Sequence, residues 1–332
     1  MPYPTLEDVA ARAGVSRALV SLVMRGSPKV GAARRAAVLA AARDLGYRPN
    51  AMARSLAAGR TGIVGVLAGD LADPAVALVH DGLADAAEGR ELRLLLAAGR
   101  GDTAAARTAL DELLDLRPDG LVLAGPRLTS ADLDRAAASC PVVVIDPVPR
   151  AGLADAVRSA SGETVRLAVS HLVGLGHRRI ATVHAGPRRP LTHRAYRSAL
   201  QKHGIDALAL GIDDLQSVLR PESPAGAAEK PTAVVALCDS SGAAVLAALM
   251  RAGARVPDDV SLVVHGEATA ADAVGVTTVA VPARELGRQA MAALLDRLDG
   301  GDPDRRPLRA NVHPLLTDRG STAPVPPAEP DA

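Results

Sequence analysis

Aromatic side chains are almost absent from this chain of 332 residues. It has no Phe and no Trp, and its only tyrosines are Tyr3, Tyr47 and Tyr196. Its hydrophobic cores must therefore be built from Leu, Val, Ala and Ile. Any aromatic ring that stacks on a base or a ligand must come from one of these three tyrosines.

Cysteines and long apolar segments are also scarce. Cys140 and Cys238 lie far apart and belong to no Cys-x-x-Cys or Cys/His motif, so we expect reduced thiols and neither a disulfide nor a metal site. No apolar run approaches the roughly 18 residues of a membrane-spanning helix. The N-terminus also lacks the basic and apolar segments of a secretory signal. These features predict a cytoplasmic protein without membrane association.

Catalytic motifs are equally lacking. The sequence has no Gly-x-Ser-x-Gly motif, no phosphate-binding loop and no paired carboxylates in an identifiable site. His171 and His177 are six residues apart without an apparent third ligand. We therefore interpret them as structural residues and expect no metal and no other cofactor. The sequence argues against an enzyme.

Charge is unevenly distributed along the chain. Residues 1–60 contain ten basic and three acidic residues, a net charge of +7, whereas the remainder has a net charge of −6. A basic segment followed by a mildly acidic body is typical of a nucleic-acid-binding head.

Three short helices are predicted in the basic segment. A capping-box pattern at Thr5 and Asp8 begins the first helix. After a turn of about three residues that contains glycine, Ser16 caps a second helix, over 17–25. A third helix follows at about 32–45. Two helices joined by such a turn form the helix-turn-helix pattern.

The basic segment also contains short motifs that match a known family. They are Thr-Leu-Glu-Asp-Val-Ala at 5–10, Gly-Val-Ser at 14–16, Gly-Ser-Pro-Lys-Val at 26–30, Leu-Gly-Tyr-Arg-Pro-Asn at 45–50 and Ala-Arg-Ser-Leu at 53–56. With these motifs, residues 5–59 resemble the DNA-binding domain of the LacI/GalR family of bacterial transcriptional regulators. Matching landmarks continue through the body, such as Leu-Gly-His-Arg-Arg-Ile at 175–180.

The resemblance implies that the helix over 17–25 enters the major groove of double-stranded DNA. Arg17, Ala18 and Leu22 occupy the base-reading positions of the family. Arg17 can offer two parallel donors to a guanine, worth about 1–3 kcal/mol of discrimination. Ala18 can make only apolar contacts and Leu22 departs from the polar residue usual there, so we expect direct readout to depend mainly on Arg17. Expected phosphate contacts come from Thr5, Ser16, Ser21 and Arg25.

The segment after the third helix resembles the hinge of the family. A helix this short is marginal by itself, so we expect a flexible linker in the absence of DNA. The resemblance implies that two such helices pair in a homodimer on DNA and contact the minor groove through Asn50, Ala53 and Leu56. Leu56 is then an apolar wedge that unstacks a base step and kinks the duplex.

The body alternates short apolar runs with helical stretches. Eight strands are expected, at 63–67, 92–96, 121–124, 142–145, 180–184, 234–237, 261–264 and 278–281. Continuous Val/Leu/Ile runs separated by helices favour parallel sheets that are covered on both faces. The resemblance implies a periplasmic-binding-protein-like body of two lobes, each with a parallel Rossmann-like sheet. The predicted fold is therefore an all-α helix-turn-helix head joined to a two-lobed α/β body.

Domain boundaries follow from these predictions. We expect a head over 1–49, a hinge over 50–60, an effector-binding and dimerisation domain over 61–321, and a disordered tail over 322–332. Within the body, the N-lobe is predicted at about 61–158 and 282–300, and the C-lobe at about 159–281 and 301–321.

The ligand cleft should lie at the carboxyl ends of the strands, and there the sequence departs most from sugar-binding relatives. Ala160-Ser161 replaces an Asp-Asn pair, Cys238-Asp239 replaces Asn-Asp, and 264–267 replaces Gly-Phe-Asp-Asp. The polar residues that remain as candidates for effector contact are Asp73, Arg194, Asp239 and His265. A sugar whose hydroxyls find no partner loses about 1–3 kcal/mol per buried group. We therefore hypothesise that a small-molecule effector, if one acts here, is not a typical sugar.

These features together predict a sequence-specific, DNA-binding transcriptional regulator, a repressor rather than an activator. A two-fold symmetric dimer would bind a pseudo-palindromic operator. The alternative is a small-molecule sensor or receptor whose head no longer controls transcription. The intact head and the missing export signal argue against that alternative.

Overall fold

The computed structural model describes residues 4–47, 60–125, 127–146, 154–184, 190–220, 223, 230–237, 239–267, 274–302 and 305–325. The chain forms two compact units, Met1–Gly62 and Ile63–Ala332, called the head and the body below. Among the described residues, no helix is long and apolar enough to cross a membrane.

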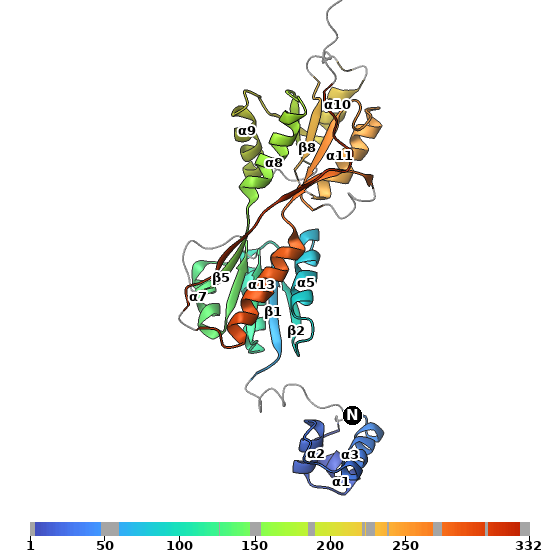
Figure 1. Ribbon diagram of the computed structural model, residues 1–332, viewed down its shortest axis with the longest axis vertical. Helices are drawn as coiled ribbons and strands as arrows, with labels where there is room; N and C mark the ends of the chain where they lie inside the picture. Colours follow the sequence, from blue (N-terminus) through green and yellow to red (C-terminus); the bar gives the residue numbers. More distant parts are fainter. Residues whose placement is uncertain are drawn as a thin grey trace, which may run out of the picture. The chain divides into compact units, whose positions relative to one another are not determined.

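The head contains the three predicted helices, α1 (Leu6–Ala13), α2 (Arg17–Met24) and α3 (Ala32–Asp44) (Figure 1). The capping box is present: the backbone N–H of Thr5 donates to the Asp8 carboxylate at 2.8 Å, and the N–H of Asp8 donates to the Thr5 hydroxyl at 3.3 Å. Gly14 ends α1 in the left-handed region, at φ 65°, which costs glycine little. The core of the head consists mainly of valine and alanine, including Val9, Val20, Val23, Val38 and Ala42.

The body contains two six-stranded sheets. The sheet of the N-lobe has the order β11-β5-β4-β3-β1-β2, and all its pairings are parallel. Its strands are β1 (Ile63–Ala68), β2 (Arg93–Ala98), β3 (Gly120–Ala124), β4 (Val142–Ile145), β5 (Asp155–Ser159) and β11 (Arg309–Val312). Helices α5 (Pro74–Ala86) and α13 (Ala283–Leu298) cover one face, and α6 (Thr103–Asp115) and α7 (Ser130–Ser139) cover the other.

The sheet of the C-lobe has the order β12-β10-β9-β8-β6-β7, with only β12 antiparallel. Its strands are β6 (Ile180–His184), β7 (Leu208–Gly211), β8 (Ala233–Ala236), β9 (Ser261–His265), β10 (Thr277–Ala280) and β12 (Leu315–Thr317). Helices α8 (Ser161–Gly174) and α9 (Pro190–Gln201) pack on one face, and α10 (Ile212–Leu219) and α11 (Asp239–Arg251) pack on the other.

All eight predicted strands are present, but four further strands, β5, β7, β11 and β12, were not predicted. One of them corrects a domain boundary. The sequence predicts residues 301–321 in the C-lobe, whereas β11 pairs with β5 in the sheet of the N-lobe. Only the part from β12 onward lies in the C-lobe sheet. The polar sequence of β11, Arg-Ala-Asn-Val, explains why no apolar run marked it.

The start of the predicted disordered tail is ordered. The backbone N–H of Ala323 donates to the Ser261 hydroxyl at 3.0 Å, and that of Val325 donates to the Leu175 carbonyl at 3.0 Å. His177 is buried and hydrogen-bonds through Nε2 to the Ala323 carbonyl at 3.1 Å. Its burial lowers the pKa of the imidazole. Residues 322–325 therefore belong to the C-lobe, and His177 is a structural residue, as predicted.

Helices α5 and α13 of the N-lobe pack backbone to backbone. A Cβ atom added at Gly82 would lie 1.9 Å from the carbonyl oxygen of Arg284, and one added at Gly287 would lie 2.0 Å from that of Val79. Only glycine allows this approach. The two helices, although about 200 residues apart in sequence, form one layer over the sheet (Figure 1).

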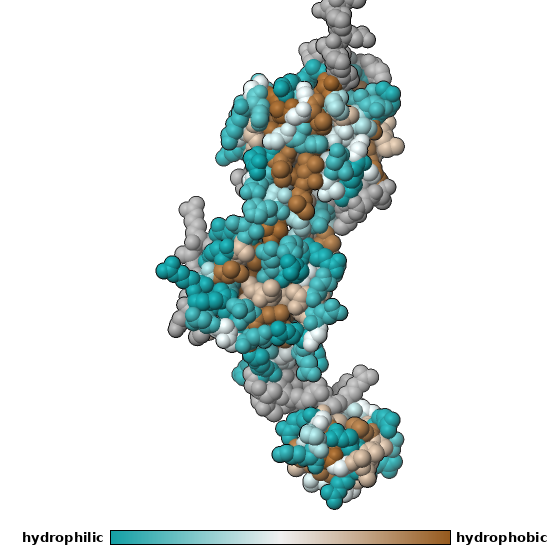
Figure 2. Space-filling model, viewed as in Figure 1, coloured by the Kyte–Doolittle hydropathy of each residue, from teal (hydrophilic) through white to brown (hydrophobic). Residues whose placement is uncertain are grey.

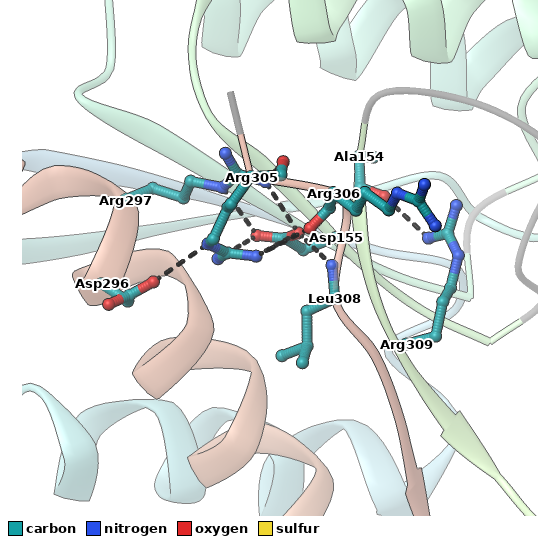
Figure 3. A network of polar contacts seen from close by, with 8 residues as sticks. All are labelled: Ala154, Asp155, Asp296, Arg297, Arg305, Arg306, Leu308 and Arg309. Atoms are coloured by element: carbon teal, nitrogen blue, oxygen red, sulfur yellow. Dashed lines mark hydrogen bonds and ion pairs between the residues drawn. The ribbon is translucent and has the colours of Figure 1, made fainter. Parts of the chain in front are cut away.

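A buried carboxylate holds the returning chain to the N-lobe (Figure 3). Asp155, at the start of β5, accepts from Arg297 Nε at 3.1 Å, from Arg305 Nη2 at 2.9 Å and from the backbone N–H of Leu308 at 2.6 Å. Burial by itself would raise the pKa of Asp155, but these donors hold it below the usual range of an aspartate. The segment before β11 is thereby fixed beside β5.

Candidate nucleic-acid interface and ligand cleft

The predicted base-reading residues lie on α2. The Ser16 hydroxyl caps the helix by accepting from the backbone N–H of Leu19 at 3.3 Å. Val20 and Val23 face the core, while Arg17 and Ala18 are exposed. Leu22 is partly buried and packs against the core of the head, so its apolar surface is only partly available to a base. Two of the three predicted base-reading side chains are thus fully displayed.

The predicted phosphate-contacting residues lie around this surface. Thr5, Ser16 and Arg25 are exposed, and Ser21 is partly buried. The Thr5 hydroxyl donates to the Asp8 carboxylate at 2.8 Å, so a phosphate that takes this hydroxyl must compete with the capping box. Arg25 Nε donates to the Ser21 carbonyl at 3.3 Å, which places Arg25 at the end of α2.

Arg17 has a partner on α1 that the sequence reasoning missed. Its Nε lies 3.0 Å from Oε1 of Glu7. Both side chains are largely exposed, at 68% and 61%. No local pattern marked this contact, because Glu7 and Arg17 lie on different helices. The predicted minor-groove residues Asn50, Ala53 and Leu56 lie outside the described residues.

The topology of the body gives the positions of the segments that cross between its two lobes. The chain crosses between the lobes after β5, after β10 and after β11. Each of these strands is parallel to its neighbour from the same lobe, so each crossing leaves from the carboxyl edge of a sheet. The carboxyl edges of both sheets therefore border the crossings, where a ligand of an open α/β lobe is expected.

The carboxyl edge of the C-lobe carries a cluster of imidazoles. Tyr196 Oη and His265 Nδ1 are hydrogen-bonded at 2.9 Å, and Thr182 Oγ1 and His193 Nδ1 are hydrogen-bonded at 3.1 Å. The rings of His184 and His193 meet edge to face, with their centroids 5.3 Å apart. Tyr196 is fully buried, and this burial raises the pKa of its phenol. Its neutral hydroxyl thus orients His265 from inside the lobe.

The predicted cleft residues fall into different environments. His265 ends β9 and is hydrogen-bonded to Tyr196. Asp73 caps α5 by accepting from the backbone N–H of Ala75 at 3.1 Å, and Arg194 is exposed on α9. Asp239 begins α11, but its side chain lies outside the described part of the structure. The structure thus joins only His265 to other polar groups of the edge.

Other carboxylates near the crossings bind backbone N–H groups. Asp146, which follows β4, accepts from Ser159 at 2.7 Å. Glu267, which follows β9, accepts from Ala283 at the start of α13 at 2.7 Å. Both bonds hold the ends of crossing segments. In the sequence, Glu267 stands out only as part of a divergent motif. Its hydrogen bond with Ala283, 16 residues away, has no local sequence signal.

Within the ranges that the structure describes, no three His, Cys, Asp or Glu side chains are arranged to hold a metal ion. Cys140 is a free thiol whose pKa is raised to about 11 by burial and by the nearby charge of Asp119. A thiol in this state is a poor nucleophile and a poor metal ligand.

Comparisons with known proteins match both units. Residues 5–50 match the family model for bacterial regulatory proteins of the lacI family, and residues 169–322 match that for a periplasmic binding protein-like domain. The HTH-type transcriptional regulator CelR of Thermobifida fusca is 31% identical, over 96% of this chain and 98% of its own length. The ribose operon repressor of Escherichia coli K12 is 30% identical, over 96% and 99%.

Solved structures show the same likeness. The lac repressor dimer bound to operator and the anti-inducer ONPF has a TM-score of 0.78 and 26% identity, and it covers 97% of this chain and 100% of that chain. A complex of the regulator CelR with cellobiose has a TM-score of 0.62 and 30% identity, with coverages of 96% and 99%. The likeness therefore spans the head and the body.

Proposed function

This chain belongs to the lacI family of bacterial regulatory proteins, and on that premise we propose that it binds a pseudo-palindromic operator as a homodimer and represses transcription from it. The chain is a transcriptional regulator with a DNA-binding and an effector-binding domain, and it is not an enzyme. The proposal rests on one observation above all: α2 is capped at Ser16 and displays Arg17 beside Ala18. In a helix-turn-helix, the N-terminal residues of the recognition helix contact the base edges.

Selection of bound fragments from randomised duplex DNA tests this proposal. The full-length protein should enrich a pseudo-palindrome with one guanine in each half-site that depends on Arg17. Arg17→Met should reduce discrimination at that guanine by about 5- to 150-fold, the range of one bidentate contact. A matched control is Arg12→Met, since Arg12 is also exposed in the head but pairs with Asp44 at 3.6 Å. Recovery of random fragments by the unmodified protein would refute operator recognition.

Dimerisation is supported by the exposed edge of the N-lobe. β2 is an edge strand, and its Leu96 is 43% exposed. The viewed face of the body also carries apolar side chains at its surface (Figure 2). An apolar edge strand tends to associate unless it is covered, so we place β2 in the dimer interface. Light scattering should give about twice the chain mass of 33.8 kDa, and Leu96→Lys should shift the protein toward the monomer.

The hinge gives a second test of operator binding. Leu56→Ala should weaken specific binding and reduce the bending of the DNA, because the apolar wedge is lost. The fold should stay intact, which circular dichroism can verify. If affinity and bending are both unchanged, the hinge has no part in the mechanism.

We also propose that the effector is not a typical sugar. The described groups at the carboxyl edges are mainly imidazoles, while Asp73, Asp146 and Glu267 bind backbone N–H groups. A sugar bound there would bury hydroxyls without the planar carboxylates and amides that usually bracket them. Isothermal titration against a panel of mono- and disaccharides tests the idea. One sugar that binds tightly and releases the operator would contradict it.

A further inference from the structure

We propose that Glu7 is a specificity-determining residue, which reads a cytosine beside the guanine that Arg17 reads. The inference rests on the proposed operator binding and adds a second reader to the surface of α2. The carrying observation is the contact of 3.0 Å between Glu7 Oε1 and Arg17 Nε. It places a carboxylate beside the side chain that is directed at the base edges.

Glu7 has no other described role in the head. The capping box of α1 uses Asp8, whose carboxylate accepts from both the N–H and the hydroxyl of Thr5 at 2.8 Å. The only other acidic residue of the first 60, Asp44, pairs with Arg12. Glu7 is therefore the acidic side chain that the fold assigns to the reading surface.

The guanidinium of Arg17 can serve both partners at once. It is planar and carries five N–H donors. Glu7 occupies the side of Nε, which leaves the two terminal nitrogens to pair with O6 and N7 of a guanine. An exposed pair of this kind is weak by itself, so the two side chains can adjust to the DNA.

The Glu7 carboxylate contacts the Arg17 guanidinium at its Nε, 3.0 Å away. Neighbouring bases are stacked about 3.4 Å apart along a strand. A carboxylate held against this side of the guanidinium is therefore directed at a base pair next to the guanine that Arg17 contacts. There it can accept from the N4 amino group of a cytosine. A base pair that presents only acceptors at that point would repel the carboxylate.

This second reader compensates for the two apolar reading positions. Ala18 has no hydrogen-bonding group and Leu22 packs partly into the core of the head. Arg17 alone would specify one base pair in each half-site. With Glu7 the same surface specifies a dinucleotide step, which multiplies the discrimination against non-specific DNA.

Selection from randomised DNA by four full-length proteins tests the proposal. The unmodified chain should select a guanine next to a base pair with cytosine on one strand. Arg17→Met identifies the guanine by abolishing its selection. Glu7→Ala should abolish the cytosine preference, and Glu7→Gln should move it toward adenine, because an amide pairs with N6 and N7 of adenine. Competition binding should show a loss of about 10-fold or more in discrimination at this position, the effect of one hydrogen bond to a charged group.

Asp44→Asn is the matched control, since it removes an exposed head carboxylate that is also paired with an arginine. It should leave both preferences unchanged. The proposal is overturned if both Glu7 variants keep the cytosine preference, or if Asp44→Asn alters it equally. If the unmodified protein selects no motif at all, operator recognition itself fails, which is a distinguishable result.

Discussion

Replacing Asp155 by Asn should lower the free energy of unfolding of the body by about 3 kcal/mol or more. The carboxylate is 2% exposed and receives donors from Arg297, Arg305 and the backbone of Leu308. An amide of the same shape keeps one oxygen but turns an NH2 group toward these donors. Two guanidinium groups, 16% and 23% exposed, then lose their buried counter-charge.

The expected loss of stability depends on the contacts that each arginine keeps when the Asp155 carboxylate is replaced. Arg305 keeps Asp296, whose Oδ2 lies 3.1 Å from its Nε. Arg297 keeps the carbonyl of Arg305 at 3.4 Å and the nearby charges of Asp296 and Asp302. Removing one partner of a buried ion pair costs about 3–5 kcal/mol, and the remaining contact of Arg305 places the expected value at the lower end. Arg305→Met should cost less, because it leaves Asp155 paired with Arg297.

Urea unfolding followed by circular dichroism measures this change, with Asp85→Asn as the control. Asp85 also forms a two-point pair, with Arg284, but both side chains are about half exposed, so its loss should have little effect. The pH dependence of the free energy of unfolding is an independent test. Because the folded pKa of Asp155 is depressed, its stabilisation is present at neutral pH and is lost as the pH falls through that pKa. An Asp155→Asn protein within 1 kcal/mol of the unmodified one would refute the reasoning.

Three further changes have defined outcomes. Gly287→Ala should destabilise the body by about 3 kcal/mol, near the upper end for overpacking, because its Cβ would meet the Val79 carbonyl at 2.0 Å; normal stability in thermal unfolding would contradict the close helix packing. Thr5→Ala should cost the head about 1 kcal/mol through the lost cap, as measured by melting of the isolated unit Met1–Gly62. Although burial opposes it, hydrogen bonds from Thr129 and Arg107 lower the pKa of Asp132 to about 2. Its contribution is therefore complete above about pH 4 and lost as the pH falls toward 2, and an Asp132→Asn protein with the same acid transition as the unmodified one would disprove that role.

The head was predictable because its signals are local. Thr5, Ser16 and Gly14 each mark a helix end through their own chemistry, and the structure places the three helices within a residue of the prediction. The central strands of the body were equally visible as continuous apolar runs. A strand that is buried on both faces must be apolar along its whole length. A continuous apolar run therefore predicts such a strand without knowledge of its partners.

The missed features depend on partners that are distant in sequence. β5 and β11 carry charged or polar residues. β5 lies between β4 and β11, and β11 is a strand because β5, about 150 residues away, lies beside it. The cluster of Thr182, His193, Tyr196 and His265 likewise forms only when two strands and a helix meet. The contact between Glu7 and Arg17 requires the crossing of two helices. The residue pattern of one segment alone cannot predict contacts with segments that are distant in the sequence.

The return of α13 and β11 to the N-lobe has a consequence for biosynthesis. A ribosome releases the head after about 60 residues, and this unit has its own core. The sheet of the N-lobe, in contrast, stays without its last strand until residue 312 has emerged. At about 5–20 residues per second, a finished head precedes a finished body by tens of seconds. Truncated products would therefore carry a folded head on an incomplete body. If the chain binds the operators proposed above, interference with the full-length regulator is the expected phenotype of late nonsense mutations.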